Sequence, residues 1–201
     1  TGDMPVILGP DGPSLGGFVC PATVVAADRW CLGQLRPGDT VRFMPVAQDD
    51  ARALAGAQAD LLQTQRERPL VVSPVPATAT TLLSTPPSES GVAVVYRPAG
   101  DEYLLVEFGP QVLDINLRFR VQALFQSFND RPLPGVIDLT PGIRSLQFHY
   151  DPQRLSRTAL LDAVRARQAG LAVLADAEAP SRIVHLPLSW DDPSTRVAIE
   201  K

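Results

Sequence analysis

Few side chains in this sequence could act as a catalytic base. His149 and His185 are the only histidines, and a hydroxyl or thiol nucleophile needs a base of this kind beside it. Both lie in short alternating runs that predict strands, so a half-exposed strand position explains each of them better than catalysis does. The His-Glu-x-x-His, P-loop and Gly-x-Gly-x-x-Gly patterns do not occur. The sequence therefore offers no signature of a zinc hydrolase or a nucleotide-binding enzyme.

The segment best suited to contact a small ligand is the glycine-rich run from Leu8 to Phe18. Its glycines let backbone amides approach a polar group without hindrance from side chains, and the run also carries one carboxylate and one hydroxyl. The alternative is a hairpin loop that only reverses the chain, and spacing alone leaves both open. The candidate substrate-binding residues are Asp11, Pro13, Ser14, Gly16 and Gly17.

The composition excludes several classes of function. The 201 residues carry 18 basic and 22 acidic side chains, a net charge of −4, which disfavours nucleic acid and anionic membrane surfaces as partners. No apolar run is long enough to span a bilayer. Cys20 and Cys31 lack the spacing of a metal site, so we expect no bound metal. The only lysine is the terminal Lys201, which argues against Schiff-base chemistry.

Residue usage also indicates where such a protein works. Two unpaired cysteines are typical of a reducing compartment, so we expect a cytoplasmic protein. The 17 arginines against one lysine favour a GC-rich coding sequence and hence a bacterial source. The chain begins at Thr1, with no initiator methionine and no leader peptide, and we expect it to be a piece of something longer.

The first half of the chain predicts a β-rich region, a helix and a linker. Residues 1–48 contain short apolar runs between Gly-Pro turns, which predict strands at Met4–Leu8, Gly17–Val25 and Thr40–Phe43. Residues 49–68 have the Ala, Leu and Gln content of one helix. Residues 69–90 are rich in Pro, Thr and Ser, a composition that favours an extended linker over a packed core.

The second half predicts a small α+β domain over residues 91–178. Its elements are strands at 92–97 and 102–108, a helix between Asp114 and Pro132, strands at 136–139 and 145–150, and a helix at 156–168. The apolar stripe of the first helix is Leu117, Val121, Leu124, Phe125 and Phe128. This ββαββα order predicts a ferredoxin-like sandwich with an antiparallel sheet and both helices on one face.

The tail, residues 179–201, predicts one strand at 183–188 and a short helix that begins after Asp192. This strand has no predicted neighbour of its own, and an isolated strand is not stable. The tail therefore looks like the truncated start of a further domain.

Several stretches resemble known families. Gly-Pro-Asp-Gly-Pro-Ser-Leu-Gly-Gly-Phe at 9–18 and Leu-Arg-Pro-Gly-Asp-Thr-Val-Arg-Phe at 35–43 are similar to the end of the allophanate hydrolase subunit 2 family, where this stretch closes a cyclophilin-like β-barrel. The motifs at 103–109, 133–135, 141–146 and 149–152 resemble the start of the subunit 1 family, whose first domain is a small α+β sandwich.

The order of these two matches resembles the carboxyltransferase region of the urea carboxylase family, as found in urea amidolyase. Residues 182–192 fit the place where a second cyclophilin-like domain begins. The resemblance implies a parent enzyme in which a biotin carboxylase domain uses ATP-Mg and bicarbonate to charge biotin. The carboxyltransferase then moves the carboxyl group from carboxybiotin to urea, which gives allophanate. The implied partners are urea and the remaining domains of the parent: biotin carboxylase, biotin carrier and the rest of the carboxyltransferase.

Urea is neutral and planar, so its site must hold it by hydrogen bonds and exclude water. The resemblance makes the loop from Asp11 to Gly17 a candidate for that role and Arg144 a weaker one. The alternative for Arg144 is a sheet-edge arginine that pairs with a nearby carboxylate. The biotinyl-lysine motif, the ATP-binding domain and the amidase-signature residues are missing from these 201 residues. We therefore expect no cofactor bound by this chain and no activity from it alone.

Two other functions stay open at this point. Stand-alone relatives of the two subunits resemble the paired subunits of an ATP-dependent 5-oxoprolinase, or a sporulation-kinase inhibitor with its antagonist, and the latter is a binding function. Carboxylases that act on guanidine share the architecture of the urea enzymes. The sequence does not separate guanidine from urea, and it does not give the oligomeric state.

Overall fold

The computed structural model describes residues 6–9, 22–66, 69–75, 81–86, 91–171, 182–187 and 192–200. Its elements, in chain order, are η1 (Ala26–Asp28), α1 (Arg29–Leu32), α2 (Gln48–Thr64), β1 (Leu83–Thr85), β2 (Val94–Pro98), β3 (Tyr103–Phe108), α3 (Ile115–Asp130), β4 (Val136–Pro141), β5 (Ser145–Tyr150), α4 (Arg157–Ala169) and α5 (Pro193–Ile199). Within these ranges no helix has the length and apolar character needed to cross a membrane.

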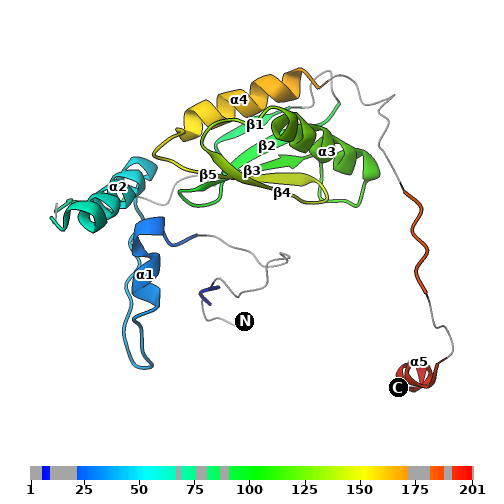
Figure 1. Cartoon of the computed structure of the whole chain (residues 1–201), viewed down its shortest axis with the longest axis horizontal. Helices are drawn as coiled ribbons and strands as arrows, with labels where there is room; N and C mark the ends of the chain where they lie inside the picture. The colour runs from blue at the N-terminus through cyan, green and yellow to red at the C-terminus, as the bar shows by residue number, and fades with distance from the viewer. Residues whose placement is uncertain are drawn as a thin grey trace.

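A single antiparallel sheet organises the chain from β1 to α4, and we call residues 91–171, which carry four of its five strands, the α+β domain. The strand order is β1-β2-β3-β5-β4, and α3 and α4 lie on the same face of this sheet (Figure 1). Side chains alternate between the faces, as the pleat of a strand requires. Leu104 lies opposite Phe148, and Val106 lies opposite Leu146, on the helix-covered face. These side chains are fully buried and form the centre of the core.

The two covering helices begin at side-chain caps. The Asp114 carboxylate accepts the backbone N–H of Asn116 at 2.8 Å, and the Ser156 hydroxyl accepts that of Ala159 at 3.2 Å, which satisfies amides that have no partner inside a helix. The predicted stripe of α3 faces the sheet, with Phe125 only partly buried and the other four members buried. Phe128 meets Phe148 edge to face, with ring centroids 4.9 Å apart. The predicted ββαββα order, the antiparallel sheet and the placement of both helices are confirmed.

Four strand predictions differ from the structure in the described residues. The described parts of Met4–Leu8 and Gly17–Val25 are not strands, and neither is Thr40–Phe43. Residues 183–187 form no strand either. A strand needs a neighbour to receive its N–H and C=O groups, and no described strand lies beside these segments. The cyclophilin-like barrel therefore stays a prediction for residues 1–48.

The structure also contains elements that the sequence pattern did not predict. Residues 83–85, inside the predicted linker, form β1, which pairs with β2 in the register Leu83 to Tyr96. Residues 26–32, for which no element was predicted, form η1 and α1. The predicted helix at 49–68 is α2, which ends at Thr64, and the short helix after Asp192 is α5.

Candidate functional site

The predicted substrate-binding loop lies outside the described residues. Asp11, Pro13, Ser14, Gly16 and Gly17 therefore stay predictions from the sequence. The run from Gly12 to Gly16 also has the spacing Gly-x-Ser-x-Gly. That spacing marks a nucleophile only where it joins a strand to a helix.

Arg144 belongs to an ion-pair cluster at the sheet. Its guanidinium donates to Glu107 Oε1 at 2.7 Å and to the carbonyl of Gly109 at 3.4 Å. Arg97 donates to the other oxygen of the same carboxylate, Glu107 Oε2, at 2.6 Å, and also to the hydroxyl of Thr81. The Glu107 side chain is only 15% exposed. Arg144 is thus the carboxylate-paired arginine that the sequence analysis held as the alternative to a substrate contact.

Two aromatic rings lie at the other end of β3, on the face that α3 and α4 do not cover. Tyr103 and His149 are cross-strand partners, and their rings stack 4.4 Å apart at 12°. His149 is half-buried, whereas His185 lies on an exposed segment that is not a strand. His149 thus occupies the half-exposed strand position expected for it, whereas the strand expected around His185 is not formed.

A long-range polar contact is made at the β2–β3 turn. Asp101 is 6% exposed, the one buried charged residue among those described. Its Oδ2 accepts the backbone N–H of Ala26 at 2.9 Å, and its carbonyl oxygen accepts Gln48 Nε2 at 2.9 Å. One residue of the turn therefore binds both η1 and the first turn of α2. We call residues 22–66 the docked segment.

Further contacts hold the docked segment against the α+β domain. Arg29 pairs with Glu102, the residue after Asp101. At the other end of the contact, Gln153 Nε2 donates to the carbonyl of Arg52, and Arg157 donates to Gln48 Oε1. Three of these five bonds between segment and domain join a side chain to the backbone, those of Asp101 with Ala26, Gln48 with Asp101 and Gln153 with Arg52, so they fix the position of the docked segment and not only its charge balance.

The backbone at this turn has no room for a side chain. Gly100 has φ +89°, and a Cβ there would lie 2.6 Å from Thr23 Oγ1 of the docked segment. Both the left-handed backbone and the close approach therefore require glycine. Beside the turn, the buried Tyr150 hydroxyl has no hydrogen-bond partner among the described residues. Burial raises the pKa of Tyr150, Arg157 opposes that rise, and Asp101 and Glu102 add to it.

The described residues thus form a framework and not a complete catalytic centre. They contain no group of three or more His, Cys, Asp or Glu side chains placed to hold a metal ion. The sequence pattern did not indicate Asp101 or Glu102, because their partners lie 75 and 73 residues away in the chain. The only local signal was the Pro-Ala-Gly-Asp turn at 98–101.

Each half of the chain matches a family model. Residues 1–45 match the model "Carboxyltransferase domain, subdomain A and B". Residues 94–197 match the model "Carboxyltransferase domain, subdomain C and D". The hydrogen bond from Ala26 to Asp101 joins the first matched range to the second.

Comparison with known proteins gives the same assignment. The chain is 35% identical to a urea amidolyase from Lachancea kluyveri over 97% of its own length and 11% of that protein. The crystal structure of a Kluyveromyces lactis urea amidolyase matches 80% of the chain with a TM-score of 0.74 and 34% identity. That of a K. lactis urea carboxylase matches 77% with a TM-score of 0.71 and 30% identity. The chain covers 10% and 14% of these two structures. The three proteins are fungal, and the bacterial source stays a prediction.

Proposed function

Because this chain belongs to the carboxyltransferase domain family, we propose that it is the part of a urea carboxylase in which subdomains A and B pass into subdomains C and D. The parent would move a carboxyl group from carboxybiotin to urea and give allophanate. Its other partners would be the biotin carboxylase, the biotin carrier and the remaining carboxyltransferase, in the cytoplasm. The relatives favour this function over a 5-oxoprolinase subunit or a kinase inhibitor.

The observation that carries the proposal is the contact between the two matched ranges. Ala26, within the subdomain A and B match, donates to Asp101, within the subdomain C and D match. The ion pair of Arg29 with Glu102 crosses the same boundary. A carboxyl transfer requires the carrier and the acceptor to meet in one fixed geometry. Contacts that set one matched range against the other serve that requirement.

The loop from Asp11 to Gly17 is our proposed contribution to the urea site. An Asp11 carboxylate would accept urea N–H groups, and the Ser14 hydroxyl and the glycine amides would donate to the urea oxygen. Carboxybiotin, when bound, supplies the activated carboxyl group. The only lysine here is terminal, so we propose that biotin and ATP-Mg are bound by other parts of the parent.

The proposal is tested by ATP turnover of the biotinylated full-length parent, with urea, guanidine and 5-oxoproline each added separately. We expect urea to stimulate turnover, and we expect avidin, which sequesters biotin, to abolish the stimulation. Stimulation by guanidine or 5-oxoproline, and not by urea, would show that urea is not the substrate. The assignment as a carboxyltransferase would then remain. No stimulation by any of the three would overturn the proposed function.

The residues are tested in the same parent by Asp11→Asn and Ser14→Ala. We expect the rate of urea-dependent transfer to fall at least about tenfold in both variants. This is the effect expected when a hydrogen bond to a charged group, or one made in the transition state, is lost. The carboxylation of biotin itself should be unchanged, because it takes place in another domain. A variant with Arg42→Gln, an exposed position in the docked segment, is the matched control.

A further inference from the structure

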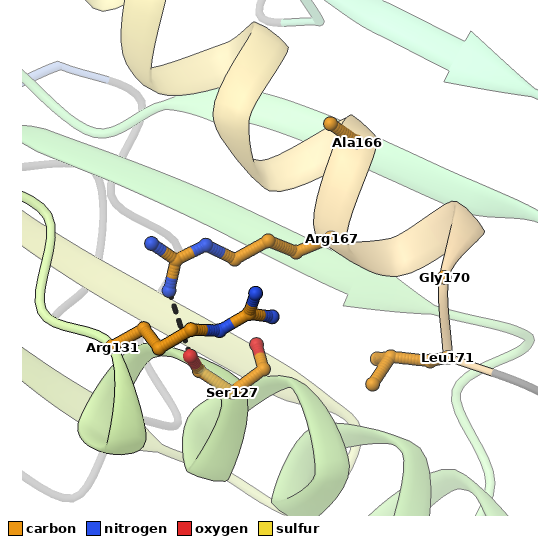
Figure 2. Close-up of a pocket in the computed structure, with 6 residues that line it drawn as sticks. All are labelled: Ser127, Arg131, Ala166, Arg167, Gly170 and Leu171. Atoms are coloured by element: carbon orange, nitrogen blue, oxygen red, sulfur yellow. Dashed lines mark hydrogen bonds between the residues drawn. The ribbon is translucent and has the colours of Figure 1, made fainter.

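A cavity of about 300 Å³ opens between the carboxyl ends of α3 and α4 (Figure 2). Its lining residues are Ser127, Arg131, Ala166, Arg167, Gly170 and Leu171. Figure 2 shows the guanidinium groups of Arg131 and Arg167 directed into the space between the two helices, with Leu171 at one side. The cavity thus combines two cationic groups with a partly apolar wall.

Arg167 is held in place by contacts with α3. It donates to the carbonyl of Ser127 at 2.7 Å, and its guanidinium lies 3.8 Å from the centre of the Phe128 ring. The carbonyl belongs to the last turn of α3, where helix carbonyls lack partners inside the helix. This contact occupies one N–H donor of Arg167 and one face of its plane. Arg167 makes no other hydrogen bond to a described residue.

Arg131 brings a second positive charge without a matching negative one. It forms no hydrogen bond or ion pair with another described residue, and no carboxylate is among the described residues that line the cavity. The adjacent Asp130 is bonded to Gln126 at 2.7 Å. Burial lowers the pKa of Arg167, and the charge of Arg131 lowers it further. Two guanidinium groups in one cavity repel each other, and an anion between them would offset that repulsion.

We propose that this cavity binds one oxyanion group, a carboxylate or a phosphate, between Arg131 and Arg167. Guanidinium groups match such anions because each presents parallel N–H donors to two oxygens. The Ser127 hydroxyl is already engaged, since it donates to the carbonyl of Leu124 at 2.7 Å. The two arginines are therefore the donors for the anion. This proposal does not depend on urea as the substrate, because the cavity belongs to the helices and not to the loop at 11–17.

The test follows the arginine Nε–Hε signals in nuclear magnetic resonance spectra of the 201-residue chain, during titration with phosphate or acetate at constant ionic strength. We expect the Arg131 and Arg167 signals to shift in a saturable way, with a Kd on the order of millimolar. Arg131→Gln should raise that Kd about tenfold, and Arg131→Lys should raise it less, because the charge remains. Arg154→Gln, at an exposed position of the same domain, should leave it unchanged.

The proposal is wrong if neither arginine signal shifts in a saturable way, or if Arg154→Gln weakens binding as much as Arg131→Gln. Urea is absent throughout, so that result would leave the proposed carboxyl transfer intact.

Discussion

The α+β domain and the docked segment are held by different forces. Every member of the hydrophobic core cluster lies within residues 91–171, where a sheet and two helices enclose it. In residues 22–66 the buried side chains are Ala27 and Ala51 alone. The docked segment instead meets the domain through Asp101, Glu102, Gln48 and Arg157.

This difference shows which part of the chain sets the position of the other. The hydrophobic effect scales with the apolar area that is removed from water, and two buried alanines contribute little of it. The domain can therefore form its fold from its own residues, and the segment takes its position from polar contacts with the domain. The predictions below test that dependence, in order of decreasing effect.

The largest effect is expected in the core of the α+β domain. Phe148→Ala removes a fully buried ring that packs against Phe128, so the free energy of unfolding should fall by about 3–5 kcal/mol. The matched change in the docked segment is Leu62→Ala, at a side chain that is 78% exposed, and it should alter stability by less than about 0.5 kcal/mol. Urea denaturation of the 201-residue chain measures both. Equal losses would show that the segment has a core of its own.

The second effect tests the contact itself. Asp101→Ala removes the acceptor of the Ala26 N–H, which should cost about 2 kcal/mol of docking free energy. Hydrogen exchange in α2 should then speed up by more than about tenfold, while exchange in β3 and β5 stays slow. Asp101→Asn keeps an acceptor oxygen and should have a smaller effect. An equal rise of exchange across the sheet would contradict a separate docking step.

The third effect concerns the ion-pair cluster on the sheet. Glu107→Gln leaves Arg97 and Arg144 without their shared carboxylate, and we expect a loss of about 1–2 kcal/mol, measured by thermal or urea unfolding. Exchange in α2 should not change, because this cluster lies away from the docked segment. A variant as stable as the wild type would show that the cluster contributes nothing measurable, as many exposed ion pairs do.

The smallest expected effect is a difference in stability between variants of two buried tyrosines. The Tyr96 hydroxyl is bonded to Gln168 at 2.6 Å, whereas that of Tyr150 has no described partner. Tyr96→Phe should therefore cost about 1 kcal/mol at pH 7, and Tyr150→Phe should cost almost nothing. Urea unfolding of the two variants at pH 7 gives this difference. A larger loss in Tyr150→Phe would show that its hydroxyl is bonded in solution.

The same tyrosines predict the alkaline behaviour. Burial raises the pKa of both above 10.0 in the folded state, so the folded chain keeps their protons when the unfolded chain loses them. Stability is then complete below about pH 10 and falls as the pH rises through the raised values. Each Phe variant should weaken this fall, measured by urea unfolding between pH 9 and about 11.5. If stability fell as steeply with pH in both variants as in the wild type, the two tyrosines would not be the cause of the alkaline loss.

Local sequence patterns predicted most of the α+β domain. The stripe of α3, its cap at Asp114 and the strand at Ser145–Tyr150 follow from short-range periodicity, and they were found. β1 was missed because three residues in a Pro- and Thr-rich run carry no pattern of their own, and their strand depends on pairing with β2. Thr40–Phe43 is the reverse case, because its local pattern predicts a strand but no described strand pairs with it.

The functional contacts were harder to predict. The pairing of Arg144 with a carboxylate was weighed as an alternative, because arginines at sheet edges commonly find such partners. The docking at Asp101 and the cavity between Arg131 and Arg167 depend on residues that are distant in the chain. Such contacts arise only after the sheet and its helices have formed, so periodicity and turn residues do not indicate them.

The central claim is that this chain is part of a carboxyltransferase that acts on urea. The most direct test incubates the biotinylated full-length parent with ATP-Mg, labelled bicarbonate and urea, and follows the label into the product. The claim predicts label in allophanate, or in the bicarbonate that its hydrolysis would return if an allophanate hydrolase follows, and ATP turnover that requires urea and is abolished by avidin. Label that stays on biotin, with turnover unaffected by urea, would contradict it.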